Sequence, residues 1–123
     1  MVLDVIPFGH MLSLMKNSIA VINPSMFEGW STTVEEAKSI GKKILLSSIE
    51  VHKEQKPERG QYFGVNDPTT LADLMEKAVE DFDANKEAIE QTKALEVHKD
   101  RVAKFAHDYE QIVMQVMSSR SAQ

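Results

Sequence analysis

Two glutamates and a glycine turn lie in one short stretch of the chain, where they could bind a polar ligand. Glu28 and Glu36 flank the segment 29–33, Gly-Trp-Ser-Thr-Thr, and an apolar run at 19–22 precedes them. A helix that begins near Thr32 leaves the backbone N–H groups of its first turn without internal partners and with partial positive charge, so they are suited to hold phosphate oxygens. Carboxylates beside such a turn accept hydrogen bonds from sugar or ribose hydroxyls. The stretch therefore predicts a nucleotide-sugar site.

Simpler roles compete for several of these residues. Two glutamates near a helix start are, without further context, most often solvated carboxylates stabilised by the helix dipole. Trp30 would either stack on a base or pack, whereas Tyr109 lies on an apolar helical stripe and is expected to pack. His52 either approaches the ligand or belongs to a surface turn, and the sequence leaves both open.

Runs of apolar and β-branched residues predict the strands that would position this stretch. Strands are expected at 2–6, 19–22 and 44–46, with one more brief strand at 62–63. The run 19–22 is continuous and apolar, so we expect it to be buried on both faces of a parallel sheet. Helices are expected from about 10 to 17, from 32 to Gly41, from 68 to 82 and over 86–117, the last with a bend or break near 95–98.

Local signals mark the helix ends. Thr32 and Glu35 have the spacing of a capping box, which explains Glu35 without a ligand, and Gly41 supplies a left-handed terminator. Asp67-Pro68 gives an N-cap followed by proline at the first helical position. The polar stretch 50–60 contains Pro57 and is expected to be a loop.

Alternating strands and helices predict an α/β fold. We expect a partial Rossmann-like parallel sheet of three to four strands flanked by helices, with a long C-terminal helical region. The predicted unit covers 1–117, its helical segment 86–117, and a disordered tail 118–123. Because the sheet is small and the helical region long, a portion of the domain is expected to be missing at the N-terminal side. The unmatched apolar stripe of the last helix makes a homodimer one expected partner.

Composition excludes several classes of protein. The 123 residues include 14 Lys and Arg and 19 Asp and Glu, for a net charge of −5, without the clustered basic residues of a nucleic-acid binder. There is no cysteine, and the histidines lack metal-ligand spacing, so no disulfide, thiol nucleophile or metal site is expected. No run of about 20 apolar residues predicts a membrane span. A cytoplasmic location follows as the expectation.

The order of motifs resembles glycosyltransferase family 4, the retaining enzymes of the two-domain GT-B fold. The donor domain of that family carries a proline-serine step and two glutamates separated by seven residues, which here are Pro24-Ser25, Glu28 and Glu36. The likeness covers most of residues 5–82, and its further matches are Ala37, Gly41, the run 44–46, the Val-His-Lys-Glu-Gln turn at 51–55, Tyr62-Phe63 and Asp67-Pro68.

The resemblance implies roles for individual residues. Glu28 would be the catalytic-site glutamate that contacts the hydroxyls of the transferred sugar, and Glu36 would hold the nucleotide ribose. The segment Gly29, Trp30, Ser31 and Thr32 would complete the donor site, with amides near Ser31 and Thr32 meeting the sugar and diphosphate. The donor would be a UDP- or GDP-sugar, and no cofactor or metal is expected.

The resemblance also implies a reaction for the whole enzyme. It would be a hexosyltransferase that moves a sugar, with retention, onto a glycan or lipid-linked acceptor, in cytoplasmic polysaccharide biosynthesis that is peripheral to the inner face of the membrane. The acceptor domain and the family's Arg and Lys pair, which neutralises the departing diphosphate, have no counterpart in this sequence, so the chain alone is expected to be inactive. The alternative is a non-catalytic nucleotide-sugar-binding or oligomerising module that needs a partner chain.

Overall fold

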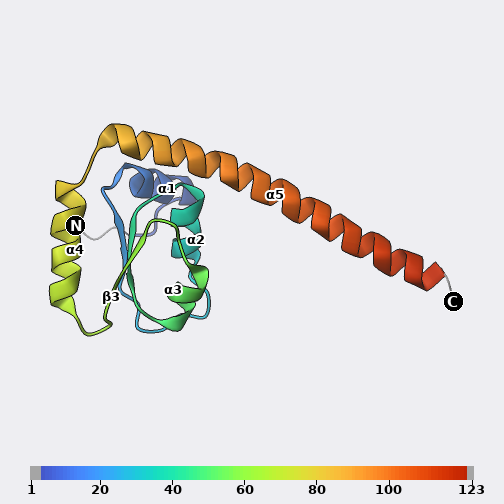
Figure 1. Cartoon of the computed structure of the whole chain (residues 1–123), viewed down its shortest axis with the longest axis horizontal. Coiled ribbons are helices and arrows are strands. Elements are labelled where there is room, and N and C mark those ends of the chain that lie inside the picture. Colours follow the sequence, from blue (N-terminus) through green and yellow to red (C-terminus); the bar gives the residue numbers. More distant parts are fainter. Residues whose placement is uncertain (1–3, 122–123) are drawn as a thin grey trace.

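The computed structural model describes residues 4–121 and shows a small α/β body from which one long helix projects (Figure 1). Five helices and three strands follow one another in the described part of the chain. Their order is α1 (Phe8–Asn17), β1 (Val21–Asn23), α2 (Thr32–Ser39), β2 (Ile44–Ser47), α3 (Glu50–Gln55), β3 (Gly60–Phe63), α4 (Pro68–Glu80) and α5 (Ala84–Ser121).

The three strands form one parallel sheet in the order β1-β2-β3. Val21 lies opposite Ile44 of β2, which in turn lies opposite Gly60 of β3. Parallel neighbours require crossover connections, and helices α2 and α3 supply them. All three carboxyl ends therefore lie at one edge of the sheet, where open α/β sheets bind ligands.

Helices cover the two faces of the sheet unequally. On one face, Met15 of α1 and Val34 and Ala37 of α2 pack with Ile44 and Leu46 of β2 in the main core. On the other face, α4 contacts β2 and β3 but makes no comparable contact with β1. Figure 1 shows α4 and α2 on opposite sides of the sheet.

The first half of α5 lies across the body and is fastened by ionic and polar bonds. Glu87 pairs with Lys42 at 2.9 Å and with Arg59 at 2.8 Å. Gln91 Nε2 donates to the carbonyl oxygen of Lys16 at 3.1 Å. These bonds fix α5 over the amino ends of β2 and β3, which is the edge opposite to the carboxyl ends.

The strand predictions need two corrections. β1 is not buried on both faces, because it is an edge strand and Ile22 remains 39% exposed beyond the reach of α4. For the predicted strand 2–6, residues 2–3 lie outside the described part, while 4–6 form no strand and Val5 is fully exposed. A strand forms only beside a partner, and the described sheet places none next to 4–6. The brief strand at 62–63 is confirmed within β3.

The predicted helices at 10–17, 32–41, 68–82 and 86–117 are all present, as α1, α2, α4 and α5, but some of their details were wrong. Asp67 accepts from the amide of Thr70, so it caps α4, and Gly41 has a φ of +65° after α2. The Thr32 capping box is wrong, because the N-cap is Ser31 and no side chain caps that helix. Residues 50–55, predicted as loop, form α3 with two buried polar side chains.

The last helix is continuous from Ala84 to Ser121, without a break at 95–98. It also includes 118–121, predicted as a disordered tail. Within this turn the hydroxyls of Ser118 and Ser119 donate back to the carbonyls of Met114 and Val116. Residues 122–123 of that tail lie outside the described part. No helix between residues 4 and 121 combines the length and the apolarity that crossing a bilayer requires.

Candidate functional site

A cluster of polar side chains gathers at the carboxyl ends of β1 and β2. We call it the carboxyl-edge cluster, and its members are Asn23, Glu28, Ser31, Ser47, His52 and Gln55. Asn23 and Ser47 are the last residues of β1 and β2, Glu28 and Ser31 come from the loop before α2, and the other two come from α3. Five of the six are less than 9% exposed, and only Glu28 reaches the surface.

Asn23 joins the strand to the loop that follows it. Its Nδ2 donates to Glu28 Oε1 at 2.8 Å and to Ser31 Oγ at 3.0 Å. Its Oδ1 accepts from the amide of Ser25 at 3.1 Å, which makes an Asx turn. One amide side chain therefore fixes the path of the whole segment between β1 and α2.

Glu28 carries a fixed negative charge at this edge. Burial would raise the pKa of its carboxyl, but hydrogen bonds from Ser31, Ser25 and Asn23 and the nearby His52 outweigh burial and lower the pKa from 4.5 to about 2. With 20% of the side chain exposed, the carboxylate is ionised at neutral pH and faces solvent. Such a group is a strong hydrogen-bond acceptor and a poor general acid or base, since proton transfer favours a pKa near the working pH.

His52 is fully buried behind Glu28. Its Nδ1 lies 2.9 Å from the carbonyl oxygen of Ser47 and 3.3 Å from the hydroxyl of the same residue. Its Nε2 lies 3.6 Å from Glu28 Oε1, which is too far for a hydrogen bond, and no other partner approaches it among the described residues. Both ring nitrogens therefore face oxygen atoms, and the imidazole supports the carboxylate from inside the fold. The Ser47 hydroxyl itself donates to the carbonyl oxygen of Ser25.

Gln55 locks α3 to the start of α2. Its Nε2 donates to the carbonyl oxygen of Ser31 at 2.8 Å and to Glu35 Oε1 at 3.0 Å, while its Oε1 accepts from the Ser31 amide at 3.3 Å. The Ser31 amide, expected to meet a phosphate, is thus already used within the protein. The next three amides, at 32–34, have no acceptor in the described structure and remain the open donors of the helix start.

The other predicted site residues lie near the cluster without joining it. Gly29 and Trp30 are exposed, and nothing lies within 4 Å of where a side chain at Gly29 would begin. Thr32 is exposed at the first position of α2. Glu36 is half-buried on the same helix, and its carboxylate makes no hydrogen bond or ion pair in the structure of residues 4–121. Glu28 and Ser31 are therefore brought together, whereas Glu36 stands apart.

Sequence reasoning missed three members of the cluster and left the role of a fourth, His52, open. Asn23 and Ser47 were not singled out, although polar residues at strand ends are common in binding edges. His52 and Gln55 were placed in a stretch expected to be a loop, but both lie in α3. Their spacing of three residues is a signal that both face the same side of a helix, but only the partners at Ser31 and Ser47 explain why that side is buried.

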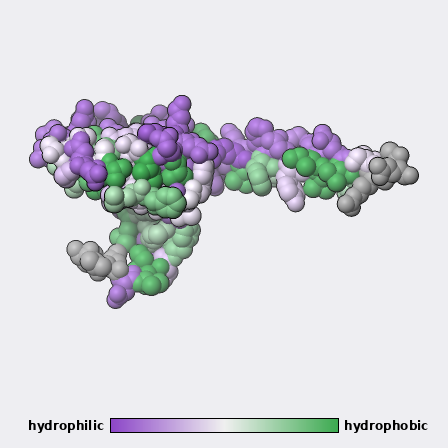
Figure 2. All heavy atoms as spheres, turned by 90° about the horizontal axis from the view of Figure 1, so that it is seen from below, coloured by the Kyte–Doolittle hydropathy of each residue, from purple (hydrophilic) through white to green (hydrophobic). Residues whose placement is uncertain are grey.

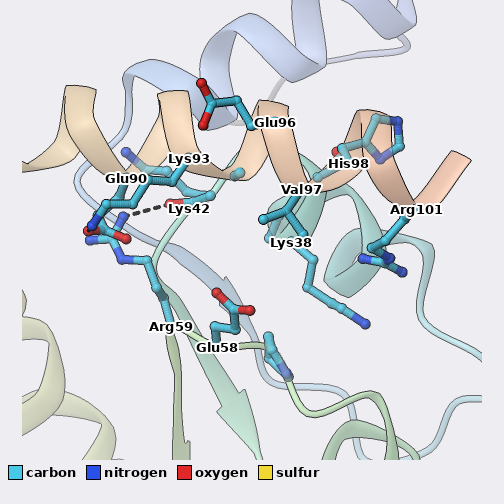
Figure 3. A pocket seen from close by; sticks show the side chains of 15 residues that line it. Lys38, Lys42, Glu58, Arg59, Glu90, Lys93, Glu96, Val97, His98 and Arg101 are labelled. Atoms are coloured by element: carbon cyan, nitrogen blue, oxygen red, sulfur yellow. Dashed lines mark hydrogen bonds and ion pairs between the residues drawn. The ribbon is translucent and has the colours of Figure 1, made fainter. Parts of the chain in front are cut away.

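A cavity lies at the opposite edge of the sheet. It has a volume of about 320 Å³ and lies between α5, the end of α2 and the turns that precede β2 and β3 (Figure 3). Each Lys and Arg that lines it has a carboxylate within 4 Å. Lys42 and Arg59 face Glu87, Lys38 and Arg101 face Glu35, and Lys93 faces Glu90. The positive charge of the cavity is therefore largely offset by carboxylates. Among the described residues, no three His, Asp or Glu side chains are placed to hold a metal ion.

Comparisons of the chain with known protein families, curated proteins and solved structures gave no match. The geometry of the carboxyl-edge cluster is therefore the basis on which a function is proposed for this chain.

The low pKa of Glu28 predicts a pH-dependent stability. A carboxylate whose folded pKa is depressed stabilises the fold above its unfolded pKa, and that contribution is lost as the pH falls toward about 2. Glu28→Gln removes the ionisation, so the difference in unfolding free energy between wild type and variant should shrink between pH 5 and pH 2 in urea titrations. The control is Glu54→Gln, an exposed α3 carboxylate without bonding partners, which should parallel wild type. A constant difference for Glu28→Gln across this range would contradict the assigned charge.

Proposed function

We propose that this chain is the nucleotide-sugar-binding part of a retaining glycosyltransferase. The observation that carries the proposal is the position of the ionised Glu28 carboxylate beside the open amides at 32–34, at the carboxyl edge of a parallel sheet. A nucleotide sugar presents hydroxyls, which need acceptors, and a diphosphate, which needs N–H donors. Both kinds of group are available at this edge, and their order along the chain is the one that the resemblance to glycosyltransferase family 4 requires.

The residues divide the work between binding and support. Glu28 accepts from the hydroxyls of the transferred sugar, and the amides of Thr32 and Thr33 meet the diphosphate. Glu36 holds the nucleotide ribose, because its carboxylate is uncommitted and lies one helical turn beyond those amides. Trp30, 54% exposed, offers an aromatic face beside them. His52 is a positioning residue that keeps the Glu28 carboxylate in place.

The charge at this edge supports a binding role in the isolated chain. Departure of a nucleoside diphosphate requires cations that neutralise the leaving group. The carboxyl-edge cluster contains no Lys or Arg, and Lys42 and Arg59 at the opposite edge are bound to Glu87. The chain alone therefore binds the donor without transferring it, and the acceptor, a glycan or lipid-linked sugar, is held by a part that is not in this sequence. Sugar transfer by the purified chain would contradict this assignment.

An amide-resolved NMR titration with UDP-glucose and GDP-mannose tests the proposal. We expect shifts confined to 28–36 for at least one donor. Glu36→Ala should weaken binding by about tenfold or more, since a hydrogen bond to a charged group is worth about 1.5–3 kcal/mol. The matched control is Glu76→Ala, an exposed glutamate of α4 on the other side of the sheet. A well-dispersed spectrum that neither donor changes at millimolar concentration would refute donor binding by this chain.

A further inference from the structure

The second half of α5 extends away from the body with an uncovered apolar stripe. Figure 1 shows this half projecting beyond the sheet, and Figure 2, viewed from below, shows hydrophobic surface along its length. Five side chains form the stripe, each more than half exposed: Val102, Phe105, Tyr109, Ile112 and Val116. A helical segment of this length is marginal in water without packing, so the stripe needs a covering partner.

The spacing of the stripe favours another helix as that partner. The intervals between successive members are three, four, three and four residues. This alternation is the heptad pattern, in which Val102, Tyr109 and Val116 occupy one set of core positions and Phe105 and Ile112 the other. The rings of Phe105 and Tyr109 stack with their centroids 6.3 Å apart, so the stripe has an aromatic centre.

The body restricts how a partner helix can lie. On the straight helix, the side of α5 that carries the stripe also holds Glu87, Gln91 and Ala94, although not in the heptad spacing, and these residues are packed on the body. A parallel copy of the chain would bring its own body onto this covered side. An antiparallel copy places only its projecting half on the stripe and its body beyond the far end. Identical projecting halves therefore cover each other fully only when they run antiparallel.

The flanks of the stripe are compatible with self-association. Ala106, Val113 and Gln115 are uncharged flanking positions, and Asp108 is the one charged residue among the four that border the stripe between Val102 and Val116. In an antiparallel pair Asp108 lies opposite Gln115 of the partner subunit, so no like charges meet. A partner of high opposite charge would need more charged flanking positions than these.

We infer that two copies of this chain dimerise through the projecting half of α5 as an antiparallel coiled coil. Tyr109 packs in one layer with Ile112 of the partner subunit, and Phe105 packs with Val116 of the partner subunit. The pairing is independent of the proposed donor site, which lies at the carboxyl edge of the sheet.

Light scattering after size exclusion, over a range of concentrations, tests the pairing. Wild type should elute with twice the 13.9 kDa mass of one chain, and Ile112→Ser should raise the dimer dissociation constant at least about tenfold. Met114→Ser is the matched control, because Met114 is 58% exposed on the opposite side of the helix, and it should remain a dimer. Thermal unfolding of the body, measured in both variants, shows whether the fold is intact. A wild-type monomer, or an Ile112→Ser dimer of unchanged affinity, would overturn the inference.

Disulfide trapping tests the relative orientation of the two α5 helices. The sequence contains no cysteine, so only the introduced cysteines can cross-link. The antiparallel register places Val102 opposite Ser119 of the partner subunit. A mixture of Val102→Cys and Ser119→Cys chains should therefore oxidise mainly to the mixed dimer, whereas each variant alone should cross-link poorly. Efficient cross-linking of each variant with itself would indicate parallel helices and refute the antiparallel arrangement.

Discussion

Glu87→Ala should lower the free energy of unfolding by about 3–5 kcal/mol, because it leaves a buried charge without its partner. Among residues 4–121, Glu87 is the one carboxylate that binds the fully buried side chain of Lys42, at 2.9 Å. The same carboxylate accepts two bonds from Arg59, at 3.1 and 2.8 Å. Without it, Lys42 retains only the carbonyl oxygen of Lys16, at 3.2 Å. For a domain of ordinary stability, such a loss is a large fraction of the total.

The pKa of Glu87 gives this prediction a pH dependence. Burial would raise the pKa of its carboxyl, but the hydrogen bonds and charges of Arg59 and Lys42 lower it. The ion triad therefore stabilises the fold above the ordinary pKa of a glutamate, and its contribution disappears as the pH falls through the lowered value. Glu87→Ala should accordingly lose its disadvantage against wild type in acid.

Urea unfolding at pH 7 measures the effect, with Glu90→Ala as the control. Glu90 lies one turn along α5, where its carboxylate binds the exposed Lys93, so its replacement should change the unfolding midpoint far less. If Glu87→Ala cost less than about 1 kcal/mol, which is the value of a surface ion pair, the triad would not be what holds α5 on the body.

Gly41→Ala should destabilise the fold by about 2–5 kcal/mol through backbone strain and overpacking together. Gly41 has a φ of +65°, where an L-residue is strained. A Cβ at this position would lie 2.5 Å from the carbonyl oxygen of Glu90 and 2.8 Å from the Cβ of Ala94. The first half of α5 would have to move away from α2, and it would loosen the ion triad as it moved.

Two control variants, compared in thermal and urea unfolding, separate backbone strain from the steric clash with α5. Gly41→Asn tolerates the left-handed backbone better than alanine but keeps the clash, so it should remain strongly destabilised. Gly29→Ala adds a methyl group where nothing lies within 4 Å, and it should be close to neutral. Near wild-type stability in Gly41→Asn would show that strain alone, and not contact with α5, explains the glycine.

The sequence predicted the elements whose signals are local. Asp67-Pro68 sets the start of α4 by its own chemistry, and Gly41 ends α2 through its own backbone freedom. By contrast, the exposure of β1 depends on which strands pair beside it. An apolar run in the sequence does not distinguish an edge strand of the sheet from a central one. The true central strand is β2, whose four residues are all buried.

The site was likewise predictable only where its residues lie close together in the sequence. Glu28 and the start of α2 were found because glycine, glutamate and threonine lie close together in the sequence. The burial of His52 and Gln55 was not predicted, because their bonding partners come from β2 and from the start of α2. The polar composition of 50–60 was correctly observed, but polar side chains can be buried when distant residues satisfy their hydrogen bonds.

The bonds that hold α5 on the body also set the order in which the fold can be completed during synthesis. The bond from Gln91 reaches back 75 residues to Lys16, and that from Glu87 reaches back 45 residues to Lys42. A ribosome that adds about 5–20 residues per second needs roughly 4–15 s to progress from the first of these partners to the last. Over the 45 residues from Lys42 to Glu87, roughly 2–9 s at the same rate, Lys42 has no carboxylate partner and the turn before β2 remains uncovered. The nascent chain therefore completes its body only when the start of α5 emerges.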